Sequence, residues 1–258
     1  MLLLIRQPLR LPTAPPKTTI VLVPESTETF GPCVERIHRY TDGPYRLVLV
    51  TPADQQEAAS QWAERTTRIV ARNAGESRRA AISRVLPVFP DDQTAILEGN
   101  PLVPPHWLLH LTARLQMLPT IAAVVPITDD GIGTQAITRY LDAEIVAQLS
   151  PEDRQALLET RYAGNTLLSY HVSLSCVLFP ARTLERLGTP DAAYLGIGRD
   201  LDYGMRSHAH GLRLAVAQDI YVAGTLTSDV DLSPDTRHAD SQRLRERLPE
   251  VYGPEIVP

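Results

Sequence analysis

Short apolar segments recur along the first half of the chain, and stretches with helical patterns separate them. The apolar segments are residues 18–23, 45–50, 68–71, 95–97 and 121–127. Their nearly continuous apolar character is typical of strands that are buried on both faces. The stretches between them that predict helices are residues 31–40, 54–65, 77–86 and 104–118. This alternation favours an α/β fold, with a mostly parallel sheet and helices on both of its faces.

The carboxyl ends of the predicted strands are where we expect a ligand to bind. In open parallel sheets, ligands occupy the crevice beyond these ends. Functional residues are therefore expected in the loops that follow Val23, Val50, Ala71 and Leu97.

The second half of the chain is less regular. It predicts strands at 171–179 and 214–222, and helices at 181–187 and 200–210. A last helix, from about residue 240 to 248, should end at Pro249, because proline interrupts helical hydrogen bonding. At 258 residues, the chain has the length of one large α/β domain. The domain organisation that we expect is a proline-rich arm at 1–17, a single domain at 18–228, and a polar tail with a short helix at 229–258.

Charge and cysteine content argue against several classes of protein. The formal net charge is −5 and the pI is about 5.8, so the broad basic surface of a nucleic-acid-binding protein is not expected. Cys33 and Cys176 lack metal-ligand spacing, which argues against a zinc site or a disulfide framework. The apolar run at residues 1–5 is interrupted by Arg6 and is too short to cross a membrane. We expect a cytoplasmic protein without a transmembrane segment, and peripheral contact with a membrane stays open.

A first candidate site lies in the loop after the strand at 68–71. Asn73 and Gly75 precede a helix that carries Arg79. Glycine allows the backbone to approach a ligand closely, a helix N-terminus attracts anions, and arginine pairs with phosphate. The alternative is an ordinary turn with solvated arginines, and on this segment alone that alternative is favoured.

A second candidate site follows the strand at 95–97. Glu98 and Asn100 flank Gly99, and their side-chain oxygens can hold a divalent cation against a diphosphate. Asparagine is a weaker metal ligand than a carboxylate. A plain turn explains the segment equally well, since glycine and asparagine both favour turns.

A third candidate site lies between Gly198 and Arg206. Asp200, at the mouth of the sheet, can remove a proton from an acceptor hydroxyl. Asp200 and Asp202 also suit the first turn of a helix, where the helix dipole favours negative charge, and alone this structural role is favoured. His171 is interpreted as a buried residue with satisfied hydrogen bonds rather than as a catalyst.

In combination, these segments resemble family-2 glycosyltransferases of the GT-A fold, over roughly residues 18–228. The order and spacing of the segments carry the resemblance, because no single motif is decisive. The matching segments are Ile20 to Pro24, Asn73 to Gly75, Ile96 to Leu108, Ala122 to Pro126, Cys176 to Gly188 and Gly198 to Gly211.

The resemblance implies a hexosyltransferase that transfers a sugar from a nucleotide-sugar donor to a hydroxyl acceptor, with inversion. The donor would be a UDP-, GDP- or dTDP-sugar, and the acceptor a glycan, a lipid-linked compound or a protein. Asp200 matches the catalytic base, and Glu98 and Asn100 match the motif that holds the diphosphate through Mg²⁺ or Mn²⁺. Thr51 falls where the family often has an aspartate that reads the nucleotide base. The resemblance also implies donor contacts for Pro24, Glu25, Asn73, Gly75, Arg79 and Gly99, and acceptor-side positions for Arg199, Asp202 and Arg206.

The chain departs from the family pattern at several of these positions. Thr51 replaces an acid, Asn100 replaces the second aspartate of the metal motif, and Arg199 replaces the acid before the base. Either Ala223 or Gly224 stands where many members have a histidine. A site that lacks a carboxylate and an imidazole should bind a divalent cation poorly, and Arg199 can partly substitute as a fixed cation. A GT-A-like module without catalysis, for binding or for assembly with a transferase, is therefore the alternative function. A nucleotidyltransferase is disfavoured, since no glycine-rich loop with a lysine follows the first strand.

Overall fold

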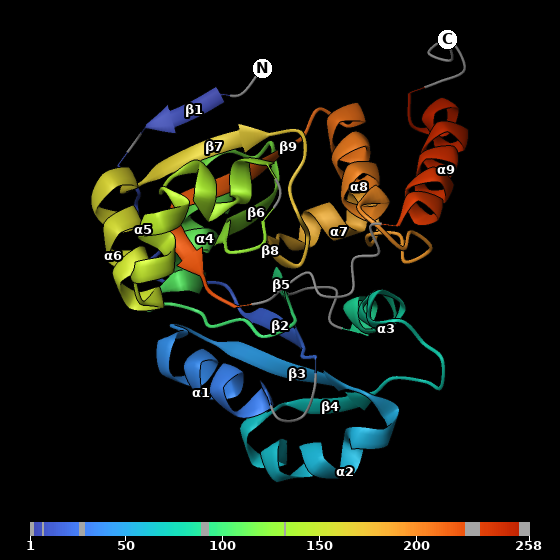
Figure 1. The fold of residues 1–258 in the computed structure, drawn as a ribbon, viewed down its shortest axis with the longest axis horizontal. Helices are drawn as coiled ribbons and strands as arrows, with labels where there is room; N and C mark the ends of the chain where they lie inside the picture. The colour runs from blue at the N-terminus through green and yellow to red at the C-terminus, as the bar shows by residue number, and fades with distance from the viewer. Residues whose placement is uncertain are drawn as a thin grey trace.

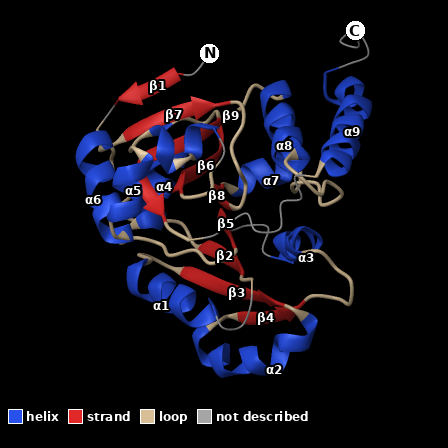
Figure 2. Cartoon of the chain, in the orientation of Figure 1, coloured by secondary structure: helices blue, strands red, loops and turns tan. Residues whose placement is uncertain are grey.

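One large sheet organises the part of the chain that the structure describes. The structure is a computed structural model and describes residues 3–6, 8–25, 29–88, 93–131, 133–224 and 233–252. Within these residues the sheet has nine strands, in the order β1-β7-β9-β6-β8-β5-β2-β3-β4. The strands are β1 (Leu3–Arg6), β2 (Thr18–Val23), β3 (Tyr45–Thr51), β4 (Arg68–Ala71), β5 (Gln93–Glu98), β6 (Ile121–Thr128), β7 (Asn165–Ser169), β8 (Cys176–Phe179) and β9 (Arg213–Val222). Figure 1 shows the strands at the centre of the molecule, and Figure 2 shows the helices around them.

The strands run in both directions. β4, β3, β2 and β5 are neighbours that run parallel, and β6 runs parallel to β9. β8 lies between β5 and β6 and is antiparallel to both, while β7 and β1 add antiparallel pairs at one edge. The α/β class predicted from the sequence is confirmed. The parallel direction predicted for the strands in the first half of the chain is also observed. The antiparallel strands could not be foreseen, because a buried strand has the same apolar pattern in either direction.

Helices cover both faces of the sheet, as predicted. Side chains alternate along a strand, so Val21 of β2 faces one side and Leu22 faces the other. The face of Val21 packs against α3 (Arg78–Val85), α5 (Ala143–Gln148), α6 (Pro151–Tyr162), α7 (Ala181–Leu187) and α8 (Gly198–Ala209). The face of Leu22 packs against α1 (Phe30–Tyr40), α2 (Gln56–Ala59) and α4 (Trp107–Met117).

Both ends of the described chain are tied to this core. β1 pairs with β7, so residues that were expected in an extended arm form an edge strand. The last helix, α9 (Pro234–Tyr252), packs beside α8 (Figure 1). The predicted limits of this helix were wrong: it begins at Pro234, where Ser233 accepts a hydrogen bond from the Thr236 N–H at 3.2 Å, and Pro249 lies inside it. A proline near the C-terminal end removes one hydrogen bond without ending the helix.

Two expectations remain, one about where the domain ends and one about a membrane-spanning segment. The expected boundary between residues 228 and 229 lies outside the described residues. Among the described residues, no helix has the length and apolarity needed to cross a membrane.

Candidate active site

The register of the parallel strands brings their carboxyl ends to one edge of the sheet. Val23 of β2 lies opposite Glu98 of β5, and Thr51 of β3 lies opposite Ala71 of β4. The loop residues that directly follow these strands, including Pro24, therefore start from the same edge. This is the edge at which the sequence predicts ligand-binding residues.

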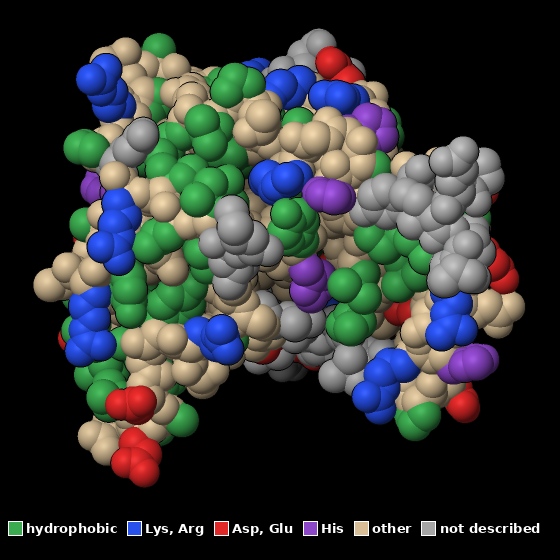
Figure 3. Space-filling view, turned by 90° about the horizontal axis from the view of Figure 1, so that it is seen from above, with side chains coloured by type: hydrophobic (Ala, Val, Ile, Leu, Met, Phe, Trp, Pro, Cys, Tyr) green, Lys and Arg blue, Asp and Glu red, His purple; other side chains and the backbone are tan. Residues whose placement is uncertain are grey.

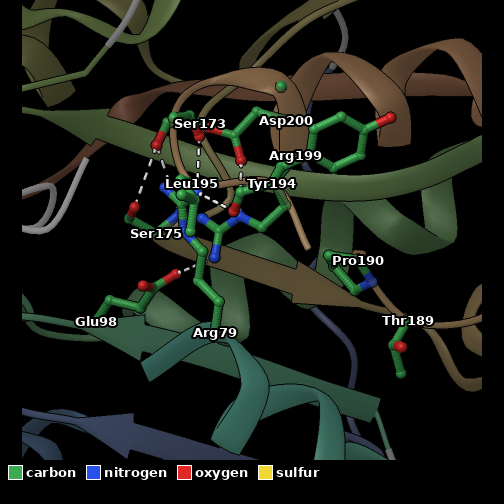
Figure 4. A network of polar contacts seen from close by, with 12 residues as sticks. Arg79, Glu98, Ser173, Ser175, Thr189, Pro190, Tyr194, Leu195, Arg199 and Asp200 are labelled. Atoms are coloured by element: carbon green, nitrogen blue, oxygen red, sulfur yellow. Dashed lines mark hydrogen bonds and ion pairs between the residues drawn. The ribbon is translucent and has the colours of Figure 1, made fainter. Parts of the chain in front are cut away.

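A buried ion triad joins this edge to the helix α8. The guanidinium of Arg199 donates from Nη1 to Oε1 of Glu98 at 2.7 Å and from Nε to Oδ1 of Asp200 at 3.0 Å. Figure 4 shows the Arg199 side chain between the two carboxylates, with Arg79 approaching from α3. All three side chains of the triad are almost completely buried. The structure thus brings together the predicted metal-motif residue Glu98 and the predicted base Asp200, with a cation between them.

Arg199 stays charged in this environment. Burial alone lowers the pKa of a guanidinium, but the charges of Glu98 and Asp200 outweigh burial and leave the pKa of Arg199 above its ordinary value. Its remaining nitrogen, Nη2, is buried and has no hydrogen-bond partner among the described residues. A buried donor without a partner is unfavourable, so this corner of the site is suited to an acceptor oxygen.

Arg79 holds the loop that leads into α8. Its Nη1 donates to the carbonyl oxygens of Tyr194 at 2.9 Å and of Gly196 at 2.7 Å. Burial lowers the pKa of Arg79, and the nearby Arg199 lowers it further. The predicted donor contact of Arg79 stays a prediction, while its observed contacts fix the backbone next to the triad.

Asp240 of α9 holds the same loop from the other side. Its carboxylate accepts from the N–H groups of Gly196 and Gly198 at 2.9 Å each and of Leu195 at 3.2 Å. A Cβ at Gly198 would lie 2.7 Å from this carboxylate, so only glycine allows the contact. Three N–H donors on one buried carboxylate make a rigid support, because charge-assisted hydrogen bonds are the strong ones. We name residues 194–198 the clamped loop.

The opposite side of α8 faces away from the triad. Residues two positions apart on a helix point about 200° apart around its axis, so Asp202 cannot share the environment of Asp200. Asp202 pairs with Arg206 at 2.8 Å and with Arg247 of α9 at 3.2 Å. Arg206 also donates to backbone oxygens of the last residue of α7 and of the segment just after it. The structure therefore does not bring Asp202 and Arg206 together with Glu98, and their acceptor-side position stays a prediction. The two residues tie α8 to α7 and α9.

The turn after β5 is shaped by close backbone contact. Gly99 has φ +72°, a conformation that favours glycine. Asn100 donates from Nδ2 to the Glu25 carboxylate at 3.4 Å, and its Oδ1 is buried without a partner among the described residues. Gly224 has φ +107°, and a Cβ on it would lie 2.0 Å from the backbone oxygen of Asn100. A histidine therefore does not fit at residue 224, which explains one departure from the family pattern.

These residues do not fit a divalent cation. The Glu98 carboxylate is engaged by Arg199, and the Asn100 side chain offers an amide rather than a carboxylate. Among the described residues, no group of three or more His, Cys, Asp and Glu side chains is placed to hold a metal ion. The guanidinium of Arg199 lies where a cation between Glu98 and Asp200 would have to lie.

The predicted donor residues at the end of β3 and in the loop after β4 differ in their burial. Thr51 is buried, and its hydroxyl has no partner among the described residues. Asn73 and Gly75 lie in an exposed turn, where Glu76 accepts from the Asn73 N–H at 2.8 Å and pairs with Arg84 at 2.7 Å. This local network favours the ordinary turn that the sequence left as the alternative.

Sequence reasoning did not foresee that two further residues, Asp240 and His171, lie near the triad. Asp240 was assigned to a polar tail, and its role depends on contacts across the fold that no local pattern reveals. His171 lies close enough to Asp200 for their charges to interact: burial lowers its pKa, and Asp200 opposes this. Its Nε2 is buried and has no partner among the described residues, so the expectation of satisfied hydrogen bonds was wrong for this nitrogen.

Comparison with known proteins identifies the family and the fold. The pattern of the family described as "Glycosyltransferase like family 2" matches residues 15–248. A mannosyltransferase from Pyrobaculum calidifontis, solved with GDP-Man and Mn²⁺, has a TM-score of 0.57 at 18% identity over 94% of this chain. GalNAc-T7, solved with UDP, GalNAc and Mn²⁺, has a TM-score of 0.60 at 12% identity over 91% of this chain.

The chain is shorter than these two proteins and matches only part of each. It spans 64% of the length of the mannosyltransferase and 48% of that of GalNAc-T7. No curated protein sequence matches it. The match over residues 15–248 and the shared architecture show that the chain belongs to the glycosyltransferase-like family 2 and has the GT-A fold.

Proposed function

We propose that the protein transfers a hexose from a nucleoside-diphosphate sugar to a hydroxyl group of a glycan, a lipid-linked compound or a protein, with inversion at the anomeric carbon. The observation that carries this proposal is the meeting of Glu98, Arg199 and Asp200 at the carboxyl edge of a family-2 domain. One structural neighbour was solved with GDP-Man, a nucleoside-diphosphate sugar, and the other with UDP and GalNAc, a nucleoside diphosphate and a sugar.

Asp200 is the residue that we assign to proton transfer. Arg199 engages its Oδ1, and we assign Oδ2 to the acceptor hydroxyl. As the hydroxyl oxygen bonds to the anomeric carbon, its proton passes to Asp200 and the bond from this carbon to the diphosphate oxygen breaks. The single displacement inverts the anomeric configuration.

Arg199 is the fixed cation of the proposed site. A guanidinium can hold phosphate oxygens with two parallel hydrogen bonds, and Nη2 is a donor that the described residues leave free. Its charge would stabilise the negative charge that develops on the leaving diphosphate. This assignment replaces the divalent cation that the family implies and that the residues do not fit.

Nucleotide binding with and without a metal ion tests the donor site. Melting temperature would be measured with UDP-, GDP- and dTDP-sugars, each in EDTA and in Mn²⁺. We expect one donor to raise it equally in both conditions, since a ligand specific for the folded state adds stability. Stabilisation only in Mn²⁺ would refute the role of Arg199, and no response to any donor would refute the donor site itself.

Replacement of Asp200 tests the chemistry. Asp200→Asn should abolish transfer of the labelled sugar and leave donor binding unchanged, because the amide cannot accept the proton. Asp235→Asn is the matched control, since Asp235 is exposed in the first turn of α9. Equal turnover in Asp200→Asn and in the control would remove Asp200 from the base role.

One observation favours a second candidate function, a GT-A-like module without catalysis. Arg199 engages both carboxylates of the triad, so their charges are already compensated within the protein. A protein of this kind would bind a ligand or a transferase and would turn over no nucleotide sugar in the transfer assay.

A cytoplasmic location is part of the proposal. Cys33 and Cys176 are both free and buried, which suits a reducing compartment. Burial raises the pKa of Cys33 to about 12, against the opposing charge of Arg36, so this thiol is unreactive. Cell fractionation checks the location.

A further inference from the structure

The last helix, α9, contributes no described side chain to the apolar cores of the molecule. The clusters of buried apolar residues on the two faces of the sheet contain residues of other elements only. Leu244 and Leu248 are the leucines of α9, and both are only partly buried. Thr236 and Asp240 are the buried residues among its described side chains, and both are polar. An element with few buried apolar contacts belongs to the part of a fold that opens most easily.

Ion pairs and charge-assisted hydrogen bonds hold α9 in place. Arg243 pairs with Asp191 at 3.2 Å. Arg247 pairs with Asp191 at 2.8 Å and with Asp202 at 3.2 Å. The side chains of Arg243 and Arg247 are 46% and 30% exposed, so dissolved salt can screen these pairs. Figure 1 shows α9 on the outer side of α8, and Figure 3 shows charged side chains exposed on that side of the molecule.

The docked helix covers Tyr194, the first residue of the clamped loop. The Tyr194 ring is completely buried, and the guanidinium of Arg243 lies 5.3 Å from its centroid. The hydroxyl of Tyr194 is buried and has no hydrogen-bond partner among the described residues. A buried hydroxyl without a partner is unfavourable, so the docked state contains a cost that contact with water would relieve.

The clamped loop carries the position of α9 to the triad. Asp240 of α9 accepts from the N–H groups of Gly196 and Gly198, and Gly198 directly precedes Arg199. When α9 leaves α8, these N–H groups lose their acceptor and become open to water. Arg79 then remains as the described side chain that holds the loop.

We propose that α9 is an ionic latch. It opens from α8 as a unit when ionic strength rises and releases the clamped loop, while the sheet stays folded. Because most helical stability in proteins comes from tertiary packing, α9 also loses its helical hydrogen bonds when it opens. The latch sets the fraction of molecules in which the segment before Arg199 is held from both sides. This inference goes beyond the proposed transferase activity and does not depend on it.

Hydrogen–deuterium exchange, read by mass spectrometry of peptides, tests the latch on the full chain. Exchange would be followed in the clamped loop, in α9, and in the central strands β6 and β9, at low and at high NaCl. We expect the loop and α9 to exchange faster together at high NaCl, because salt screens the exposed ion pairs, while β6 and β9 stay protected. Equal loss of protection in the loop and in the strands would show that α9 opens only with the whole molecule, which would overturn the proposal.

Variants of the two arginines test the ion pairs themselves at low NaCl. Arg243→Gln with Arg247→Gln should speed exchange in the clamped loop by at least about fivefold, since one partly exposed ion pair contributes up to about fivefold to an equilibrium. Arg243→Lys with Arg247→Lys keeps both charges and should restore most of the protection. Arg245→Gln is the matched control, because Arg245 is exposed on the same helix and pairs with no described residue. Protection of β6 and β9 in each variant shows that the variant is folded.

Each remaining outcome decides the matter. Loop protection that neither NaCl nor the loss of both arginines changes would show that these ion pairs do not hold α9, and would overturn the proposal. An equal effect of Arg245→Gln would assign the change to net charge instead of to the contacts, and would also overturn it. The exchange experiment contains no nucleotide sugar, so failure of the proposed function leaves its result unchanged.

Discussion

Removal of the Arg199 guanidinium should destabilise the fold far more than removal of an exposed arginine. Arg199→Met removes the cation that lies within 3.0 Å of both Glu98 and Asp200, and no other described residue supplies one. The side chains of Glu98 and Asp200 are 7% and 3% exposed. Breaking a buried ion pair from one side costs about 3–5 kcal/mol, because the remaining charge is left without compensation. With two carboxylates orphaned, we expect a loss of about 5 kcal/mol in the free energy of unfolding.

The comparison variant is Arg84→Met. Arg84 pairs with Glu76 at 2.7 Å, but its side chain is 39% exposed. Exposed pairs contribute about 0–1 kcal/mol, so this loss should be small. Urea denaturation followed by circular dichroism measures the free energy of unfolding of both variants. Equal losses for Arg84→Met and Arg199→Met would refute the reasoning.

A triple variant separates lost charge pairing from lost packing. Glu98→Gln, Arg199→Met and Asp200→Asn together leave no uncompensated charge, and replacing a whole buried ionic group by residues of similar volume is often neutral. We expect it to recover to within about 2 kcal/mol of the original protein. A triple variant as unstable as Arg199→Met alone would show that the arginine acts through packing.

Three further predictions concern residues around the triad. Asp240→Asn should lower the free energy of unfolding by about 1–3 kcal/mol, because one amide oxygen cannot replace a carboxylate that accepts from three N–H groups. The control Asp235→Asn, at an exposed residue, should change it by less than about 0.5 kcal/mol. Urea denaturation measures both. Gly224→Ala should cost about 2 kcal/mol or more in the same measurement, because its Cβ would lie 2.0 Å from the Asn100 oxygen at φ +107°. Burial lowers the pKa of His171 in the folded protein, so the unfolded chain takes up its proton first and stability falls as the pH drops below about 6.5. His171→Phe should reduce this fall in melting temperature, and an unchanged pH dependence would exclude His171 as its source.

The sequence predicts the strands that position the site better than it predicts the contacts between the side chains of the site. The strands that end at Val23, Thr51 and Glu98 were predictable, because continuous apolar runs follow directly from burial on both faces. The meeting of Glu98 and Asp200 followed only from the family resemblance. That Arg199 compensates both charges could not be foreseen, since side-chain direction depends on the tertiary contact.

Other features carried a local signal that was not used. The spacing of Asp202 and Arg206 is i, i+4, which predicts an ion pair along one face of a helix. Ser233 followed by Pro234 is a helix start of the same kind as Ser150 followed by Pro151. The contact between Asp240 and the clamped loop had no such signal, because 44 residues separate Asp240 from Gly196.

The clamped loop has a consequence for the order of events during synthesis. One of its supports, Arg79, precedes Gly196 by 117 residues, and the other, Asp240, follows it. Because α9 leaves the ribosome after all the other described elements, the sheet can assemble before the segment ahead of Arg199 is fixed on both sides. A chain interrupted before α9 would keep Glu98, Arg199 and Asp200 but would lack the support that sets their geometry. We therefore expect Arg79 alone to hold the segment ahead of Arg199 until residue 240 has left the ribosome.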